Sequence, residues 1–167
     1  TNGFRTKTQG VDLVMSQPIK MLDGVTIMSF NGNWTKTKVE SYTPDVLDAK
    51  RIRQIEEGLP AIRYNLAGTY LNGPWRNLLR LNYFGKFFEA HLDDATLPIE
   101  AGDEYTLDFE TAYNISTNLT VALGAQNLLN EYPDEHPYQG IAGAKYPETS
   151  PMGFNGGFYY SRITYNF

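Results

Sequence analysis

Histidines, carboxylates and tyrosines are the side chains with which this chain could do acid–base or metal chemistry, and they gather in one segment. Residues 130–138, "NEYPDEHPY", bring together three acids, one of the two histidines and two tyrosines. Neither His91 nor His136 has a partner at metal-ligand spacing such as His-x-x-x-His. The neighbouring acids Glu56–Glu57 and Asp93–Asp94 point to opposite sides of an extended chain, which argues against a general acid and base.

The interpretation without a functional role is that residues 130–138 form a solvated acidic loop. The alternative is a loop that contacts a ligand or a cation. No arrangement of Ser, His and Asp stands out elsewhere. We therefore predict that the protein is not an enzyme, that it has no metal site and that it uses no cofactor.

Composition narrows the class of protein further. The chain has 167 residues, a net charge of −5 and no cysteine. The acidic balance argues against a nucleic-acid partner, and the absence of cysteine excludes disulfides and thiolate metal sites. Mean hydropathy is −0.41, and no apolar run approaches the roughly 20 residues of a membrane helix. These values do not exclude a β-barrel membrane protein, because only every second residue of its strands is apolar.

Period-2 alternation recurs between turn residues and predicts about seven strands. The first predicted strand has Val11, Leu13 and Met15 on one face. The second has Met28, Phe30 and Trp34 on one face and Val25 and Ile27 on the opposite face. Four later strands should form one sheet with an apolar face and a polar face. The apolar face is predicted to hold Leu79, Leu81, Leu107, Phe109, Val121, Leu123, Ile163 and Tyr165, and the polar face Arg80, Asp108, Glu110 and Arg162.

The connections between these strands alternate in length. Short connections are expected at Gln17–Gly24, Asn72–Pro74 and Asn114–Asn118, and long ones at roughly 40–59, 85–103 and 129–152. An up-and-down membrane barrel has short periplasmic turns and long outer loops, whereas a soluble sandwich has no reason for this alternation. Aromatic residues near the strand ends would form the two girdles at the membrane interfaces. The polar side chains would then face a wet lumen: Arg63, Arg80, Asp108, Glu110 and Arg162.

The first long connection also carries a helix signature. Thr43 is a possible N-cap, Pro44 suits the first helical position, and Gly58 and Pro60 mark an end. The acid-rich segment 87–100 is predicted to be a loop rather than a further strand.

Several segments resemble the TonB-dependent outer-membrane receptors. "GAQNLLNEYPD" followed by "KYPETSPMGFNGGFYYSRITYNF" is similar to the C-terminal end of that family, which closes on a strand ending in aromatic-x-Phe. Upstream, "KTQGVDL", "LPAIRYNLAGTY" and "LRLNYFGKFFE" resemble further strands of the family. Asp12 stands where the family usually has Glu, and Gly157 where many members carry Arg.

The resemblance implies a barrel of about 22 strands around an N-terminal plug, of which residues 1–167 would be the C-terminal portion. The plug, the TonB box and the first barrel strands would be absent, which fits a start that we expect to be a cut end. Localisation would be the bacterial outer membrane, as a multi-pass β-barrel.

The same resemblance implies active uptake of a ferric siderophore, cobalamin, haem or an oligosaccharide. The partners would be that extracellular ligand, outer-membrane lipid, the TonB complex through the missing N-terminal region and the barrel-assembly machinery. An outer loop would touch ligand through Tyr132, Asp134, His136 and Tyr138, and the assembly signal would comprise Tyr159, Ile163, Tyr165 and Phe167.

Two other hypotheses remain at this point. A small complete outer-membrane barrel, acting as an adhesin or structural protein, would need an even number of strands. A soluble β-sandwich carbohydrate-binding module would bury its aromatic residues between two sheets.

Overall fold

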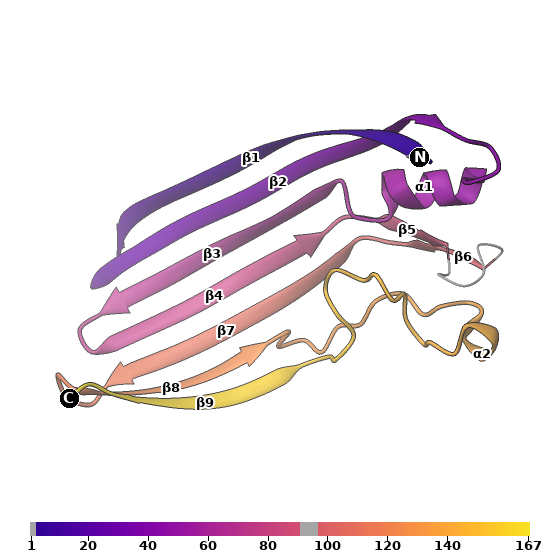
Figure 1. Ribbon diagram of the computed structural model, residues 1–167. Helices are drawn as coiled ribbons and strands as arrows, with labels where there is room; N and C mark the ends of the chain where they lie inside the picture. Colours follow the sequence, from indigo (N-terminus) through magenta and orange to yellow (C-terminus); the bar gives the residue numbers. More distant parts are fainter. Residues whose placement is uncertain (1–2, 91–96) are drawn as a thin grey trace.

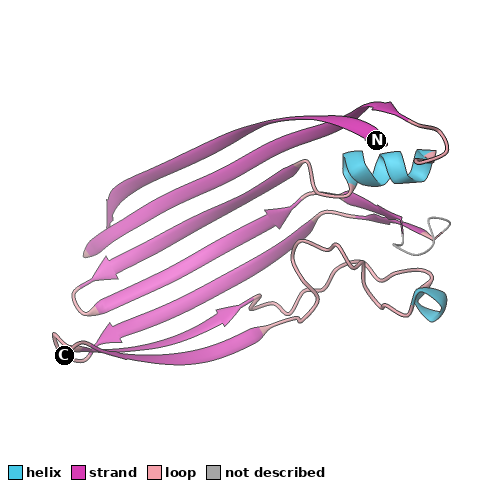
Figure 2. Cartoon of the chain, in the orientation of Figure 1, coloured by secondary structure: helices cyan, strands magenta, loops and turns pink. Residues whose placement is uncertain are grey.

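The computed structural model describes residues 3–90 and 97–167, which form mainly one antiparallel sheet (Figure 1, Figure 2). Seven strands lie in the order β1-β2-β3-β4-β7-β8-β9, and β5 and β6 form a separate two-stranded sheet. The predicted all-β meander is therefore confirmed, as an open sheet with β1 and β9 at its edges. The strands of the large sheet are β1 (Phe4–Met21), β2 (Gly24–Tyr42), β3 (Ile62–Asn72), β4 (Trp75–Phe84), β7 (Glu104–Asn114), β8 (Leu119–Gln126) and β9 (Phe158–Tyr165).

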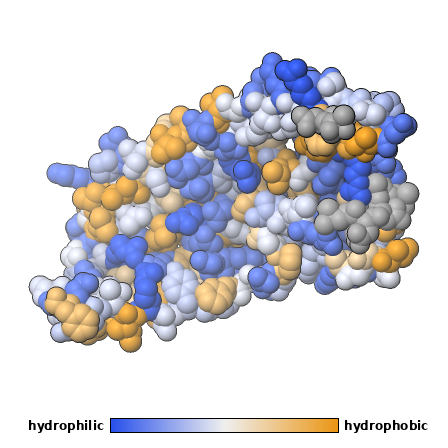
Figure 3. Space-filling model, in the orientation of Figure 1, coloured by the Kyte–Doolittle hydropathy of each residue, from blue (hydrophilic) through white to orange (hydrophobic). Residues whose placement is uncertain are grey.

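The register of the sheet confirms the predicted division into two faces. Directly paired residues point the same way in an antiparallel sheet, and their neighbours along the strand point the other way. Leu79 pairs with Phe109, and Arg80 pairs with Asp108. The ladders from β7 to β8 and from β8 to β9 continue this register. We call the side of Leu79 the outward face and the side of Arg80 the polar face. Figure 3 views the polar face, where hydrophilic side chains gather across the middle strands.

The first strand is longer than the sequence pattern predicted. β1 reaches Met21, and only Leu22 and Asp23 separate it from β2. The predicted connection Gln17–Gly24 was therefore wrong, because most of it belongs to the β1–β2 hairpin. Pro18 can be part of the strand because β1 is an edge, where a missing N–H can face the open side. As predicted, Val25 and Ile27 lie on the face opposite Trp34.

The alternation of short and long connections is confirmed. Residues 22–23, 73–74 and 115–118 make the short turns, all at one end of the sheet (Figure 1). Gly73 has a φ of 54°, the positive value that the first central residue of a type II′ hairpin turn requires. The long connections all leave from the opposite end.

Helix α1 (Ala49–Glu57) begins later than predicted. Asp48, not Thr43, is its N-cap: the Asp48 carboxylate accepts a hydrogen bond of 2.8 Å from the backbone N–H of Arg51. This bond satisfies a backbone donor that would otherwise have no partner in the first turn. The predicted end is confirmed, since Gly58 is the C-cap and its N–H donates to the Gln54 carbonyl.

The segment predicted as a plain loop after β4 instead contains a hairpin, β5 (Phe87–Ala90) with β6 (Pro98–Ala101). All four residues of β5 are buried, so this hairpin is a small packed unit at the long-loop end. It is not a strand of the large sheet, and the count of seven holds. His91 and the Asp93–Asp94 pair lie outside the described residues.

The large sheet is a single layer. In residues 3–90 and 97–167 no second large sheet is stacked on it, which contradicts the soluble-sandwich hypothesis. Leu79, Leu123 and Ile163 are 51%, 57% and 73% exposed on the outward face. Neither helix of the described chain has the length and apolar character needed to cross a membrane.

Candidate functional site

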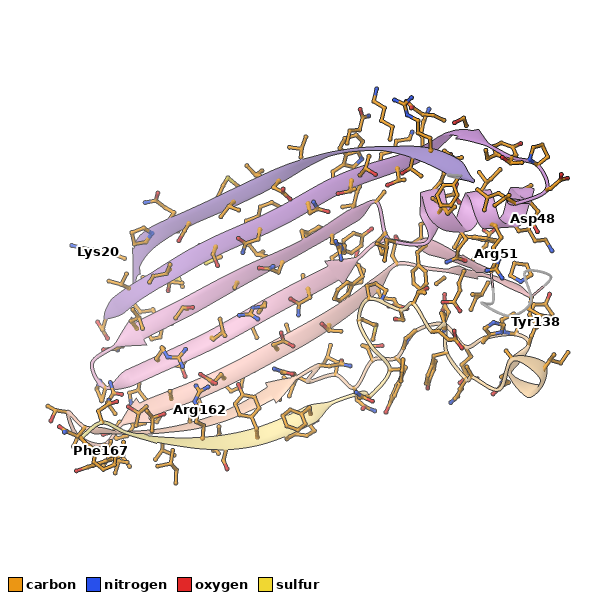
Figure 4. The ribbon with its side chains drawn as sticks, in the orientation of Figure 1. Lys20, Asp48, Arg51, Tyr138, Arg162 and Phe167 are labelled. Atoms are coloured by element: carbon orange, nitrogen blue, oxygen red, sulfur yellow. The ribbon has the colours of Figure 1, made fainter. Side chains whose placement is uncertain are left out.

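Glu110 of β7 is the centre of a charged network on the polar face. Its side chain is only 7% exposed. It accepts hydrogen bonds from Arg162 at 2.9 and 3.0 Å, from the Tyr160 hydroxyl at 2.7 Å and from Arg76. In Figure 4, Arg162 lies over β8, between its own strand β9 and β7. One carboxylate thus ties together side chains from β4, β7 and β9.

A row of amide side chains crosses the polar face nearer the long loops. Asn31, Asn65, Asn82 and Thr106 are successive partners across β2, β3, β4 and β7. The Asn31 amide donates to Asn65 at 3.0 Å, and that of Asn82 to Thr106 at 3.0 Å. The three asparagines of this row, with Arg63 above them, line a hollow of about 370 Å³. Such a surface can bond neutral polar groups, because each amide carries both donors and acceptors.

All five residues predicted to face a lumen lie on the polar face. The guanidinium of Arg80 lies 3.9 Å from the carboxylate of Asp108. Arg63 pairs with Phe84, and both lie on the polar face because Phe84 alternates with the outward Tyr83. The polar-face residues are Arg63, Arg80, Asp108, Glu110 and Arg162.

Two rows of aromatic rings cross the outward face. At the long-loop end Tyr83 lies 4.6 Å from Tyr64 and 5.0 Å from Tyr105, measured between ring centroids. We call this row the upper belt. At the short-turn end Trp75 lies 4.6 Å from Tyr113, and these two form the lower belt. The outward positions between the belts on β3, β4 and β7 carry no charge; they are Leu66, Gly68, Tyr70, Asn77, Leu79, Leu81, Leu107, Phe109 and Thr111.

The three long connections pack together into what we call the outer cap: α1, the β5–β6 hairpin and residues 127–157. Arg53 of α1 donates to Glu100 of β6 at 2.7 Å, and its guanidinium lies 4.1 Å from the centre of the Phe88 ring. The hydrogen bond and the charge of Arg53 lower the pKa of Glu100. The N–H of Val39 donates to Glu56 at 2.8 Å, which fixes the helix to β2.

Glu89 fastens the third part of the cap to the hairpin. It is 1% exposed, and its carboxylate accepts hydrogen bonds from the N–H of Glu148 at 3.1 Å and from the N–H of Thr149 at 2.7 Å. The Thr149 hydroxyl donates to the same carboxylate. A buried carboxylate with three donors holds the loop in one position, because any displacement leaves the charge unpaired.

The predicted outer-loop residues lie, as expected, at the end of the sheet opposite residues 72–73 and 116–118 (Figure 1). Tyr132 is 43% and Tyr138 is 37% exposed. Asp134 accepts a 2.8 Å hydrogen bond from the Gly102 N–H. His136 is 1% exposed, and its Nδ1 accepts from the Tyr138 N–H. The tyrosines and Asp134, which is also exposed, can therefore meet a solute, while the buried His136 holds the loop in shape.

Tyr138 also begins the short helix α2 (Gln139–Ala142) (Figure 4). The four residues predicted as an assembly signal lie at the C-terminal edge. Tyr159, Ile163 and Tyr165 are on the outward face of β9, and the Phe167 ring lies 5.1 Å from that of Tyr165.

Three residues important to these networks were not singled out from the sequence. Alternation along the strands puts Tyr160 on the face of Arg162 and Arg76 on the face of Arg80, but it says nothing of their shared partner, Glu110. Glu89 lies in the otherwise apolar run "FFEA". An acid within such a run is a signal of a buried, hydrogen-bonded carboxylate.

The described residues, 3–90 and 97–167, contain no group of three or more His, Asp or Glu side chains placed to hold a metal ion. Comparison of the chain with known proteins gave one finding: a family model described as "TonB dependent receptor-like, beta-barrel" matches residues 1–128. Neither the search of curated proteins nor that of solved structures found a match. The match covers most of the chain and agrees with the meander and its two faces, so the chain belongs to the TonB-dependent receptor-like β-barrel family.

Proposed function

We propose that this chain is the C-terminal part of the barrel wall of a bacterial outer-membrane receptor that actively takes up an extracellular ligand. The observation that supports it best is the separation of the two faces. Uncharged side chains alone occupy the outward face between the belts, while Arg80, Asp108, Glu110 and Arg162 share the other face. A hydrocarbon environment requires such a face, because burying an unpaired charge there costs several kcal/mol.

In this orientation the outward face meets outer-membrane lipid and the polar face lines the lumen. The short turns face the periplasm and the outer cap faces the medium. An open sheet of seven strands leaves two unpaired edges, so further strands of the same receptor complete the barrel. An N-terminal plug in the lumen would meet the amide row, and energy would come from the TonB complex through that N-terminal region.

The ligand class is a small molecule or an oligosaccharide, with ferric siderophores, cobalamin and haem among the candidates. Tyr132 and Tyr138 are its proposed contacts in the outer cap, because exposed aromatic rings give large contact areas at low conformational cost.

Single cysteines introduced into this chain test the orientation, because its 167 residues contain none; any cysteine elsewhere in the full-length receptor would first be replaced by serine. In the full-length receptor in outer membranes, Leu79→Cys and Phe109→Cys would carry a spin label, with Arg80→Cys and Asp108→Cys as neighbours on the other face. We expect oxygen dissolved in lipid to relax the first pair and a water-soluble nickel chelate to relax the second. The reverse pattern, or equal access of the chelate to all four, would refute the membrane orientation.

The ligand contact has its own test. A Tyr132→Ala/Tyr138→Ala receptor should bind its ligand about tenfold more weakly, as expected for two exposed aromatic contacts. Binding and uptake would be measured for ferric siderophores, cobalamin, haem and oligosaccharides. The control is Ile115→Ala, a change of an exposed apolar side chain in a short turn at the other end. Unchanged binding in the double variant would remove this loop from the site.

A further inference from the structure

Charged residues on the outward face are confined to one corner. Over the described residues of the seven strands, outward positions carry charge only at the long-loop end of β1 and β2: Lys7, Lys36, Lys38 and Glu40. Arg5, next to the irregularity in the β1–β2 register, forms an ion pair of 3.3 Å with Glu40. With Glu40 paired to Arg5, the other outward charges at this corner are three lysines, in a chain whose net charge is −5.

These lysines are placed close together without an acidic partner. Lys7 pairs directly with Lys38 across the two strands, and Lys36 follows two residues before Lys38 on the same face. All three are exposed, and none has an ion pair within residues 3–90 and 97–167. Like charges directly opposite each other destabilise a sheet. An anion held between them removes that repulsion.

The height of the cluster matches a lipid headgroup. Trp34, on the same face of β2, lies two residues below Lys36 and four below Lys38. Those steps are roughly 7 and 14 Å along the strand, or about 5 and 10 Å along the membrane normal at the usual tilt. The headgroup region is about 5–8 Å deep on each side of the hydrocarbon. Lysine side chains extend their ammonium groups into this zone while their stems stay on apolar surface.

We propose that Lys7, Lys36 and Lys38 form a binding site for the phosphate of an anionic membrane lipid on the outer surface of the barrel. The assignment rests on the membrane orientation proposed above. The site lies directly above an apolar stretch of the same two strands, Val11, Leu13 and Trp34. A lipid therefore gains contact for its acyl chain as well as its phosphate, which free phosphate does not.

The test uses the full-length receptor in mixed micelles of a neutral detergent and phosphatidylcholine that also contain phosphatidylglycerol. Phosphatidylglycerol retained by the receptor would be measured at low and at high salt. Lys7→Gln/Lys36→Gln/Lys38→Gln should weaken retention at low salt by about fivefold per lysine, on the order of 100-fold in all. The matched control, Lys20→Gln/Lys50→Gln/Lys86→Gln, removes the same charge elsewhere and should retain the lipid. Lys7→Arg/Lys36→Arg/Lys38→Arg keeps the charge and should also retain it.

Equal retention by the native and the triple-glutamine receptor overturns the site, and so does an equal loss in the control. Displacement of the lipid by millimolar inorganic phosphate overturns the assignment to a lipid. The cysteine pattern described above separates this failure from a failure of the membrane orientation, since that pattern does not involve the lysines.

Discussion

Glu110 places one negative charge between two cations, Arg76 and Arg162, and so offsets their mutual repulsion. Glu110→Gln would leave two guanidinium groups facing a neutral amide. Because Arg162 is half exposed, water screens part of the loss, and we expect a decrease of about 1–3 kcal/mol in the free energy of unfolding. Urea unfolding of the full-length receptor in detergent measures it. Glu57→Gln, which removes an exposed pair with Arg53, should cost under about 1 kcal/mol. Equal effects would contradict a central role for Glu110.

Glu89 should control the position of the outer cap rather than the barrel. Glu89→Gln keeps the size of the side chain but loses the charge that three donors on Glu148 and Thr149 share. Residues 127–157 should then loosen, and trypsin added to intact cells should cleave faster after Lys145. Glu148→Gln, an exposed change beside the same contact, is the control. Cleavage at the native rate in Glu89→Gln would show that the loop is held by other contacts.

Phe167 is the last residue and the most exposed aromatic ring of the outward face. If it belongs to the signal read by the barrel-assembly machinery, its deletion should lower the amount of receptor in the outer membrane. Ligand affinity of the molecules that do assemble should stay near the native value. Phe167→Tyr keeps the ring and should assemble normally. A normal surface level of the truncated receptor would remove Phe167 from the signal.

At the scale of the strands, the position along the outward face should set the cost of a charge. Leu79→Arg places a cation midway between the belts on β4 and should cost about 2–4 kcal/mol in folding into lipid. Leu119→Arg, at the end of β8 where it pairs with Tyr165, should cost about 0–1 kcal/mol. Reversible folding into liposomes measures both. Similar costs at the two sites would argue against a membrane-spanning sheet.

Alternation predicted the strands best, for a physical reason. A strand between lipid and water must place Leu79 and Arg80 on opposite sides, and this requirement is local to the strand. The extent of β1 was missed because Pro18 and Asp23 mark a turn in most contexts, whereas here only Leu22–Asp23 turn. The helix start was misplaced because Thr43-Pro44 and Asp48 are both acceptable beginnings, and the Asp48–Arg51 bond decides between them.

The outer cap was beyond the reach of a local pattern. The partners of Glu89 are about sixty residues away in the chain, and the burial of β5 depends on packing at the long-loop end of the sheet. His136, expected to touch ligand, is buried by contacts with its own loop that no spacing rule encodes.

For the whole molecule, the two edges of the sheet decide how the isolated chain behaves. β1 and β9 each leave one side unpaired, and every unsatisfied backbone group in hydrocarbon costs several kcal/mol. The isolated 167-residue chain should therefore not insert into a bilayer as a monomer. In detergent-free buffer it should associate through its edges or its outward face, which light scattering measures. A dispersed monomer with Leu79, Phe109 and Ile163 exposed would contradict the membrane-barrel interpretation.

The spacing of the two belts also sets the kind of membrane that this wall fits. Tyr83 and Trp75 are eight residues apart on β4, as are Tyr105 and Tyr113 on β7. That is roughly 27 Å along a strand and about 19–22 Å across the membrane at the usual tilt. A bilayer with the common hydrocarbon thickness of about 30 Å would have to thin around the protein, at a fraction of a kcal/mol for each ångström. Hydrophobic mismatch thus favours a thin membrane, and the thickness of the bilayer contributes to sorting this protein among membranes.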